Sequence, residues 1–105
     1  MMKNITVQTN ITIRQAMKTL DKTAEKCLLV IDDNNKLLGT LTDGDLRRGI
    51  LSGMNFSENI SECYHQDATT FSQGNYTQED ATQVFRDEKL DLIPIIDKDG
   101  KVVDY

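Results

Sequence analysis

The chain contains an internal repeat, because shifting the sequence by 65 residues aligns it with itself without a gap. Residues 27–32 fall on residues 92–97, two largely apolar runs that both end in Asp, and residues 36–38 fall on residues 101–103. Upstream residues also match in pairs: Thr12 with Thr77, Ala16 with Ala81, and Leu20 with Phe85. A helical pattern and a strand pattern that recur at one offset indicate two copies of one structural unit. We place the first unit, with its connecting segment, at residues 1–62 and the second at residues 63–105.

The first unit is expected to open with a helix and a strand. Apolar residues follow the spacing of one helix face at Ile13, Ala16, Met17, Leu20 and Ala24. Thr12 and Gln15 have the spacing of a capping box at the start of that helix. The continuous apolar run at residues 27–31 is typical of a strand that is buried on both faces.

A second strand and a second helix follow in the same unit. Residues 32–35 predict a turn, and residues 37–41 predict a strand. Residues 43–52 predict a helix that ends near Gly53. On one side of this helix we expect Leu46, Ile50 and Leu51.

The second unit repeats this order but is incomplete. Thr77 and Asp80 predict the start of a helix whose inner face holds Ala81, Val84 and Phe85. Residues 92–96 predict a strand, residues 97–100 a turn, and a further strand opens at residue 101. The sequence stops before any counterpart of residues 42–45 and of the helix after them. We therefore expect a second unit without its last helix, in a fragment of a longer protein.

Composition narrows the classes of partner. The formal charge is −5, from 12 basic and 17 acidic residues, which argues against nucleic acid or an anionic membrane as the main partner. The apolar runs are too short to span a bilayer, and the first residues contain no apolar signal segment. Cys27 and Cys63 are the only cysteines, and we expect free thiols in a reducing cytoplasm.

The clearest candidate for chemistry is the turn at residues 42–45, with Thr42, Gly44 and Asp45. A helix N-terminus offers unpaired N–H groups to a phosphate, and a carboxylate accepts hydrogen bonds from ribose hydroxyls. The same spacing is also that of a capping box, and the local pattern leaves both interpretations open. Arg47 and Arg48 either offset the acidic charges of this turn or form a solvated face.

Other catalytic and metal chemistries have weaker support. The turns at residues 32–35 and 97–100 are acidic, but they lack the spacing and the closing Glu of an EF-hand, so we predict ordinary turns and no metal site. His65 lies two residues after Cys63, but no third group is placed to complete a nucleophilic site. The glycine motifs for nucleotide hydrolysis and for dinucleotide binding are absent from the sequence. We predict no catalytic residue.

These features resemble a tandem pair of cystathionine-β-synthase-type (CBS) motifs, also called a Bateman module. The resemblance rests on the buried strand that ends in Asp32, on Gly39, on residues 42–45, and on residues 93–97 with Gly100. It implies an α/β (α+β) fold of two β-α-β-β-α units about a pseudo-two-fold axis, with two clefts between them. Clefts of this family bind adenine nucleotides (AMP, ADP or ATP), less often S-adenosylmethionine, and no cofactor is required.

The resemblance also implies ligand-binding residues. Thr42 and Asp45 would hold ribose and phosphate, within a turn that includes Thr40 and Gly44. The opposite wall would come from the second unit, near His65, Thr70, Leu90 and Asp91. Asp104 stands where the first unit has Gly39, and the second Thr-x-x-Asp would lie beyond Tyr105, so the second site cannot be judged.

The resemblance further implies a regulatory module rather than an enzyme. CBS pairs with this turn resemble those attached to sugar-phosphate nucleotidyltransferases and to arabinose-5-phosphate isomerases. We favour the former, because the chain opens with Met and enters the first motif at once. The expected partners are a nucleotide, the attached enzyme domain and a second copy of the chain in a homodimer. The alternative is a structural dimerisation module that binds no ligand.

Overall fold

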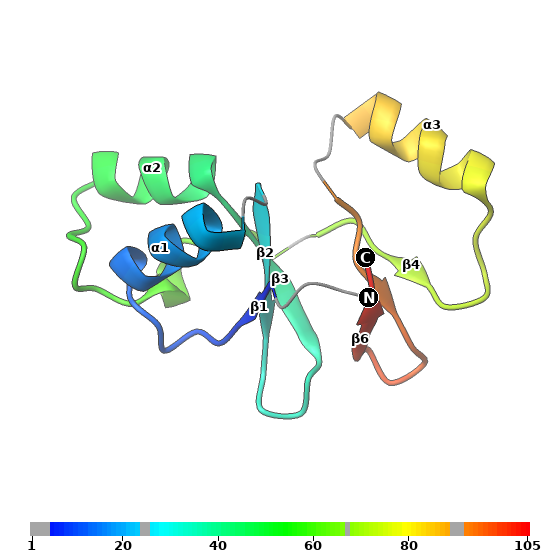
Figure 1. Cartoon of the computed structure of the whole chain (residues 1–105), viewed down its shortest axis with the longest axis horizontal. Coiled ribbons are helices and arrows are strands. Elements are labelled where there is room, and N and C mark those ends of the chain that lie inside the picture. The colour runs from blue at the N-terminus through cyan, green and yellow to red at the C-terminus, as the bar shows by residue number, and fades with distance from the viewer. Residues whose placement is uncertain (1–4, 24–25, 67, 89–91) are drawn as a thin grey trace.

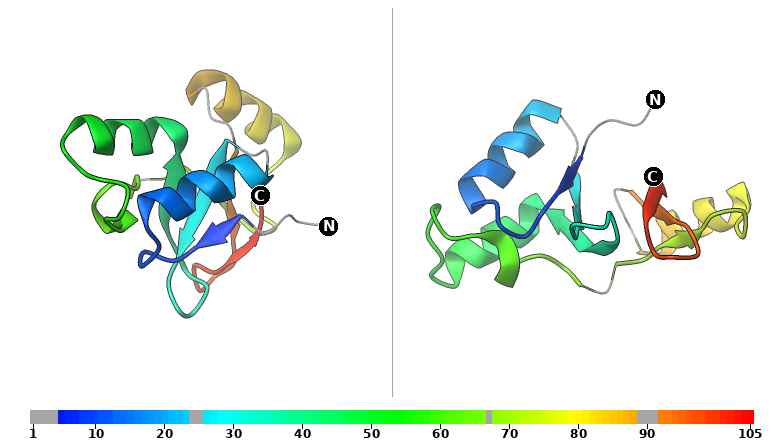
Figure 2. Two further views of the ribbon diagram at one scale, coloured as in Figure 1. Left: turned by 60° about the vertical axis from the view of Figure 1, so that its left-hand side comes forward. Right: turned by 90° about the horizontal axis from the view of Figure 1, so that it is seen from below.

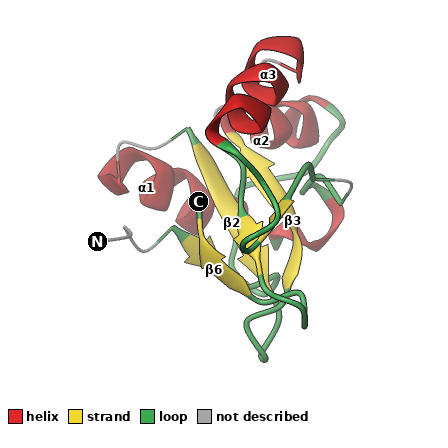
Figure 3. Cartoon of the chain, turned by 90° about the vertical axis from the view of Figure 1, so that its right-hand side faces the viewer, coloured by secondary structure: helices red, strands yellow, loops and turns green. Residues whose placement is uncertain are grey.

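A computed structural model describes residues 5–23, 26–66, 68–88 and 92–105, without the side chains of Phe85 and Glu88. Two units lie side by side, with α1 and α2 in one and α3 in the other (Figures 1 and 2). Each unit contains a three-stranded sheet. The strands run through the middle of the molecule and the helices lie at its periphery (Figure 3). No helix in the described ranges is long and apolar enough to cross a membrane.

The first unit has the order β-α-β-β-α. Its elements are β1 (Thr6–Val7), α1 (Ile13–Thr23), β2 (Cys27–Ile31), β3 (Leu37–Thr42) and α2 (Asp43–Leu51). The sheet order is β1-β2-β3, with β1 parallel and β3 antiparallel to β2. The central strand β2 coincides with the predicted run, and its first four residues are buried, as expected for a strand covered on both faces.

The second unit repeats this order as far as its last strand. Its elements are β4 (Phe71–Ser72), α3 (Gln78–Glu88), β5 (Ile95–Ile96) and β6 (Val102–Asp104), in the sheet order β4-β5-β6. The predicted strand at residues 92–96 is wrong in its length, because only its last two residues pair as a strand. Pro94 has no N–H group to donate to a strand ladder, although its carbonyl accepts the Phe71 N–H at 3.1 Å. The mixed α and β fold predicted from the sequence is confirmed.

The internal repeat recurs in the register of the two hairpins. Ile31 pairs with Leu37 in the first hairpin, and Ile96 pairs with Val102 at the same 65-residue offset in the second. Both hairpins also contain an irregularity at the equivalent step, between Val30 and Ile31 and between Ile95 and Ile96. Our division of the chain at residue 62 stays a prediction.

The turns of the two hairpins are held by equivalent aspartates. The Asp32 carboxylate accepts the backbone N–H groups of Asn34 and Lys36 at 2.8 and 3.0 Å. The Asp97 carboxylate accepts those of Asp99 and Lys101 at 2.9 and 3.0 Å. These hydrogen bonds, the one from Lys101 foremost, lower the pKa of Asp97 because they stabilise the charged form. Such internal bonding explains the acidic turns without a metal.

Both predicted helix starts have the geometry of capping boxes. Thr12 N–H donates to the Gln15 side chain at 2.8 Å, and Gln15 N–H donates to the Thr12 hydroxyl at 3.1 Å. The same reciprocal pair joins Thr77 and Asp80, at 2.9 and 3.1 Å. Each box satisfies two N–H groups that a helix start would otherwise leave unpaired.

Two apolar residues predicted to face inward do not. Met17 is 38% exposed, because the buried stripe of α1 is limited to Ile13, Ala16 and Leu20. Leu51 is 79% exposed. It lies five residues after Leu46, which rotates it by about 140° around the helix and away from the core. Of the other predicted inner residues, Ala24 and the side chain of Phe85 lie outside the described part of the chain.

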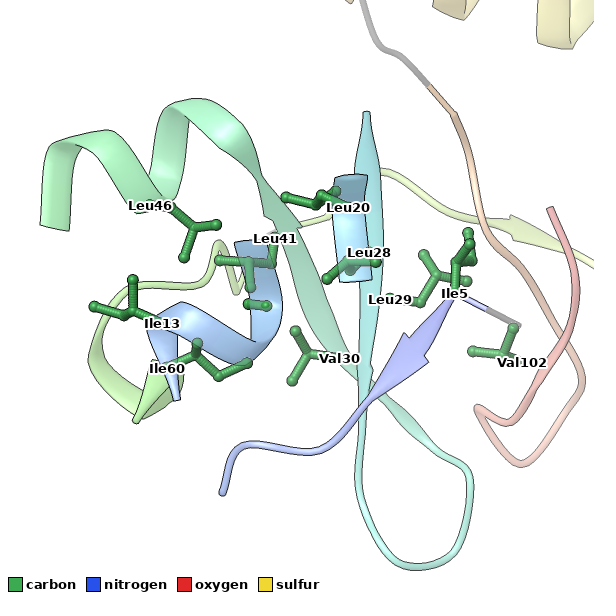
Figure 4. Packing of buried hydrophobic residues seen from close by; sticks show 11 residues of the cluster. Ile5, Ile13, Leu20, Leu28, Leu29, Val30, Leu41, Leu46, Ile60 and Val102 are labelled. Carbon is green, nitrogen blue, oxygen red and sulfur yellow. The ribbon is translucent and has the colours of Figure 1, made fainter. Parts of the chain in front are cut away.

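One hydrophobic cluster spans the first unit and reaches into the second (Figure 4). Its buried members are Ile5, Ile13, Ala16, Leu20, Leu28, Leu29, Val30, Leu41, Leu46, Ile60 and Val102. Ile60 comes from a short 3-10 helix, η1 (Ile60–Glu62), in the connecting segment. Val102 belongs to β6, so the second hairpin contributes to the core of the first unit.

Within the described ranges, backbone hydrogen bonds join the units at two places. Near the hairpin turns, Leu37 N–H donates to Gly100 O at 2.9 Å, and Val102 N–H donates to Asn35 O at 3.1 Å. The connecting segment then crosses β3, where Thr40 and His65 exchange both backbone hydrogen bonds, at 2.9 and 2.8 Å. Gly39 makes this crossing feasible, because a Cβ at that position would overlap the His65 carbonyl oxygen.

The burial of α2 yields a first prediction. Leu46→Ala should lower the free energy of unfolding by about 2–5 kcal/mol, because it leaves a cavity in the core. Leu51→Ala, the same change on the exposed side of the same helix, should alter it by less than about 0.5 kcal/mol. Urea unfolding followed by circular dichroism measures both. Equal losses for the two variants would contradict the observed orientation of α2.

The crossing at β3 yields a second prediction. Gly39→Ala should destabilise the chain by about 1–3 kcal/mol or more, because the new methyl group meets rigid backbone rather than a movable side chain. The control is Gly44→Ala, whose Cβ would lie nearest to the flexible end of Arg48, at 3.3 Å, and in ordinary contact with the Thr42 hydroxyl, at 3.7 Å. The same urea measurement applies. A Gly39→Ala protein as stable as the control would show that the segment does not cross β3 this closely.

Candidate functional site

The candidate site is the corner where β3 ends and α2 begins. Thr42 is the N-cap of α2, with an extended backbone at φ −111° and ψ 167°. Its hydroxyl accepts the Asp45 N–H at 3.2 Å and donates to Asp45 Oδ2 at 3.0 Å. The Thr42 N–H donates to the same oxygen at 2.9 Å. The capping-box interpretation of residues 42–45 is therefore confirmed, and the ligand-binding interpretation stays a prediction.

The two arginines of α2 pair with acids of its first turn. Arg48 Nη2 donates to Asp45 Oδ1 at 2.7 Å, from a side chain that is 71% exposed to one that is 13% exposed. Arg47 Nη2 donates to Asp43 Oδ2 at 2.8 Å, and both of these side chains are largely exposed. Both carboxylate oxygens of Asp45 thus have partners within the turn.

The corner borders two hollows on the surface. A groove of about 760 Å³ is lined by Met17, Leu20, Asp21, Lys26, Thr42, Asp43 and Gly44. A smaller hollow of about 310 Å³ is lined by Asp45, Arg48, Gly49, Ser52, Met54, Glu62 and Cys63. The Arg48 guanidinium lies near the boundary between them, because a Cβ on Gly44 would be only 3.3 Å from its Nη1.

The structure brings only some of the predicted site residues together. Thr42 and Gly44 line the larger groove, and Asp45 contacts Thr42 from the smaller hollow. Thr40 lies two residues before the corner and pairs through its backbone with His65. Thr70 is half-buried in the segment that leads into β4, and Leu90 and Asp91 lie outside the described residues.

Sequence reasoning missed one wall of the larger groove. Met17, Leu20 and Asp21 come from the end of α1, and Lys26 stands directly before β2. The sequence placed Met17 and Leu20 on the inner face of the helix, and only the structure shows Met17 38% exposed beside the groove. Lys26 gave no signal, because only the fold brings the start of β2 beside the start of α2.

Neither cysteine forms a disulfide bond in the structure. Cys27 is buried in β2, and Cys63 is half-buried beside the smaller hollow. Burial of the Cys63 thiol, together with the negative charge of Asp45, raises the pKa of Cys63 above the ordinary value for cysteine. Cys63 is therefore a protonated, weakly nucleophilic thiol near neutral pH. Within the described ranges, no three acidic, histidine or cysteine residues gather as metal ligands.

Comparison with known families identifies the first unit. Residues 1–52 match the family model of the CBS domain. The chain is 29% identical over 98 residues to inosine-5'-monophosphate dehydrogenase of Aquifex aeolicus, covering 93% of this chain and 20% of that protein. It is 30% identical over 90 residues to the arabinose 5-phosphate isomerase GutQ of Escherichia coli O6:H1, covering 86% of this chain and 28% of that protein. The chain thus spans only about a fifth to a little over a quarter of these relatives.

Solved structures extend the similarity to the whole fold. Protein MJ1225 of Methanocaldococcus jannaschii superposes with a TM-score of 0.85 at 21% identity, covering 97% of this chain and 42% of that one. The CBS domain pair of protein MJ0100 gives 0.83 at 22% identity, covering 99% and 81%. CBSX2 in complex with AMP gives 0.80 at 23% identity, covering 94% and 77%. The chain therefore belongs to the CBS domain family: its first unit is a CBS domain, and the whole chain has the fold of a CBS pair.

The environment of Cys63 yields a third prediction. Asp45→Asn should lower the pKa of Cys63 and speed its alkylation by iodoacetamide near pH 8, because one of the two causes of the raised pKa is removed. The pKa should stay above the ordinary value, since burial is the larger cause. Asp43→Asn removes the same charge from the same turn, where Arg47 pairs with it, and should leave the rate unchanged. Peptide mass spectrometry distinguishes alkylation of Cys63 from alkylation of Cys27. Equal rates of Cys63 alkylation in the two variants would contradict the effect of the Asp45 charge on the pKa of Cys63.

Proposed function

We propose that this chain is a regulatory module that binds an adenosine-type nucleotide at the corner between β3 and α2. The observation that carries the proposal is the coupling of Thr42 to Asp45 beside a groove. A ligand oxygen bound at the Thr42 hydroxyl lies next to the Asp45 carboxylate, because these two groups are 3.0 Å apart. Carboxylates accept sugar hydroxyls through strong, charge-assisted hydrogen bonds.

The groove supplies the other groups that a nucleotide needs. The start of α2 presents N–H groups and the positive end of the helix dipole to a phosphate. Met17 and Leu20 offer apolar surface for a base, and Lys26 offers a positive charge. His65 and Thr70, with Leu90 and Asp91, are proposed to complete the site from the second unit.

Nucleotide complexes among the structural relatives support this choice of ligand. CBSX2 was solved with AMP, and the cytosolic domain of the Mg2+ channel MgtE with ATP. The CBS pair of MJ0100 was solved with 5-methylthioadenosine and S-adenosyl-L-methionine. All of these ligands contain an adenosine unit, so an adenosine-type ligand is the narrowest class that they support for this chain.

The proposed role of the module is to regulate an attached enzyme. A ligand that contacts both units favours the arrangement of the units that it binds best. The relatives inosine-5'-monophosphate dehydrogenase and GutQ are enzymes much longer than this chain. We propose an attached enzyme that acts on a sugar phosphate, either a nucleotidyltransferase or an arabinose-5-phosphate isomerase. We further propose pairing of two copies through their CBS motifs, for which the exposed Leu51 offers apolar surface.

Calorimetric titration with AMP, ADP, ATP and S-adenosylmethionine tests the binding proposal. Asp45→Ala should weaken binding at least about tenfold, because a charge-assisted hydrogen bond to the ribose is lost. The matched control is Asp80→Ala, which removes the equivalent capping box of α3. Both variants should lose about 0.5–2 kcal/mol of stability, but only the first should lose affinity.

Two outcomes would contradict the binding proposal. The first is a wild-type chain that binds none of the four compounds. The second is equal affinity in the wild type and the Asp45→Ala variant. Either result would leave the corner as a helix cap alone and would favour a module that dimerises without a ligand.

A further inference from the structure

We propose that Arg48 determines which ligands the corner accepts, by pairing with Asp45 in the empty site and with a ligand phosphate in the occupied one. This inference rests on the nucleotide site proposed above and concerns its specificity. It predicts that the site prefers a nucleoside monophosphate to the corresponding nucleoside.

Arg48 occupies the carboxylate oxygen that a ribose would need. Asp45 Oδ2 already accepts the N–H and the hydroxyl of Thr42, and those bonds hold the start of α2. Among the residues that the structure describes, only Arg48 donates to Oδ1, through its guanidinium at 2.7 Å. A sugar hydroxyl that binds Asp45 without breaking the helix cap must therefore displace Arg48 from Oδ1.

Arg48 can leave Asp45 if a sugar hydroxyl takes over the hydrogen bond to Oδ1, because the carboxylate, which is 13% exposed, is then not left without a partner. The Arg48 side chain is 71% exposed, so its guanidinium stays in contact with water as it moves. The long arm of Arg48 also has an open path, because Gly44 has no side chain to block its guanidinium. The contact can thus open without disturbing the core around α2.

The displaced guanidinium lies where a phosphate would be held. Side chains on a helix point back toward its N-terminus, and Arg48 follows this rule by reaching Gly44 in the first turn. Gly44 and Thr42 line the larger groove, so the guanidinium is at the edge of the same groove. The planar fork of arginine matches the oxygens of a phosphate better than a lysine does.

A phosphate in this groove needs such a partner. Asp21 and Asp43 line the groove and Asp45 adjoins it, so carboxylates surround the start of α2. Arg47 is paired with Asp43, and Lys26 approaches from the start of β2. When a ribose hydroxyl replaces Arg48 at Asp45 Oδ1, the movement of Arg48 to the phosphate brings one positive charge to the ligand.

The test compares AMP and adenosine by calorimetric titration of the full chain. Arg48→Gln should weaken AMP about tenfold, through loss of a charge-assisted contact. The same variant should leave adenosine unchanged or improve it by up to about threefold, because Asp45 Oδ1 no longer has to be vacated. The ratio of the affinity for AMP to the affinity for adenosine should therefore fall by a factor of ten or more. Arg48→Lys, which keeps the charge but not the fork, should give an intermediate ratio.

Arg47→Gln is the matched control, since it removes the same charge one residue earlier from an exposed pair. It should change the ratio by less than about twofold, because exposed charges are screened by salt. Equal ratios in the Arg47→Gln and Arg48→Gln variants, with AMP binding intact in the wild type, would overturn this inference and leave the nucleotide site standing. A wild type that binds neither compound would overturn both.

Discussion

The structure depends on β2, the strand whose two faces are both covered. Residues 27–30 are buried and pair with β1 on one side and with β3 on the other. Because β3 is fixed along β2, its last residue Thr42 and the start of α2 are fixed as well. The connecting segment then lies on β3 through Thr40 and His65 and leads the chain into the second unit. A change in β2 would therefore move the corner, its groove and the junction together.

A complete helix cap and a ligand site are compatible at the same residues. The cap uses the Thr42 hydroxyl, the Thr42 N–H and one oxygen of Asp45, and it orients the carboxylate before any ligand arrives. In the described part of the chain, the other oxygen accepts only the guanidinium of Arg48, whose side chain is 71% exposed. The cap bonds thus fix the geometry of the turn, while the exposed side chain of Arg48 can move without disturbing them. Preorganisation of this kind lowers the ordering cost of binding.

The sequence predicted features that depend on near neighbours. The bounds of β2 follow from an unbroken apolar run, and the three capping boxes follow from pairs three residues apart. It failed where contacts between distant segments decide the outcome. The burial of Val102 in the core of the first unit and the approach of Lys26 to Thr42 are such contacts. The exposure of Leu51 and the short β5 have local causes that the prediction overlooked, namely the turn of the helix after Leu46 and the missing N–H of Pro94. The partners of Arg47 and Arg48 follow the local rule that opposite charges four or three residues apart pair on a helix, although the sequence analysis left the role of both arginines open.

Coupling between the units has a physical path in this structure. Val102 of β6 packs in the core of the first unit, and the two hairpin turns share backbone hydrogen bonds. The burial of equivalent residues nevertheless differs, because Ala16 is fully buried in α1 while Ala81 is half-buried in α3. The inner face of α3 is therefore less completely buried than that of α1 at this position. A ligand that contacts both units, as proposed, would restrict the position of the second unit relative to the first. Linkage makes this effect reciprocal. If the ligand favours one position of the second unit by a given factor, any contact that holds the unit in that position strengthens ligand binding by up to the same factor.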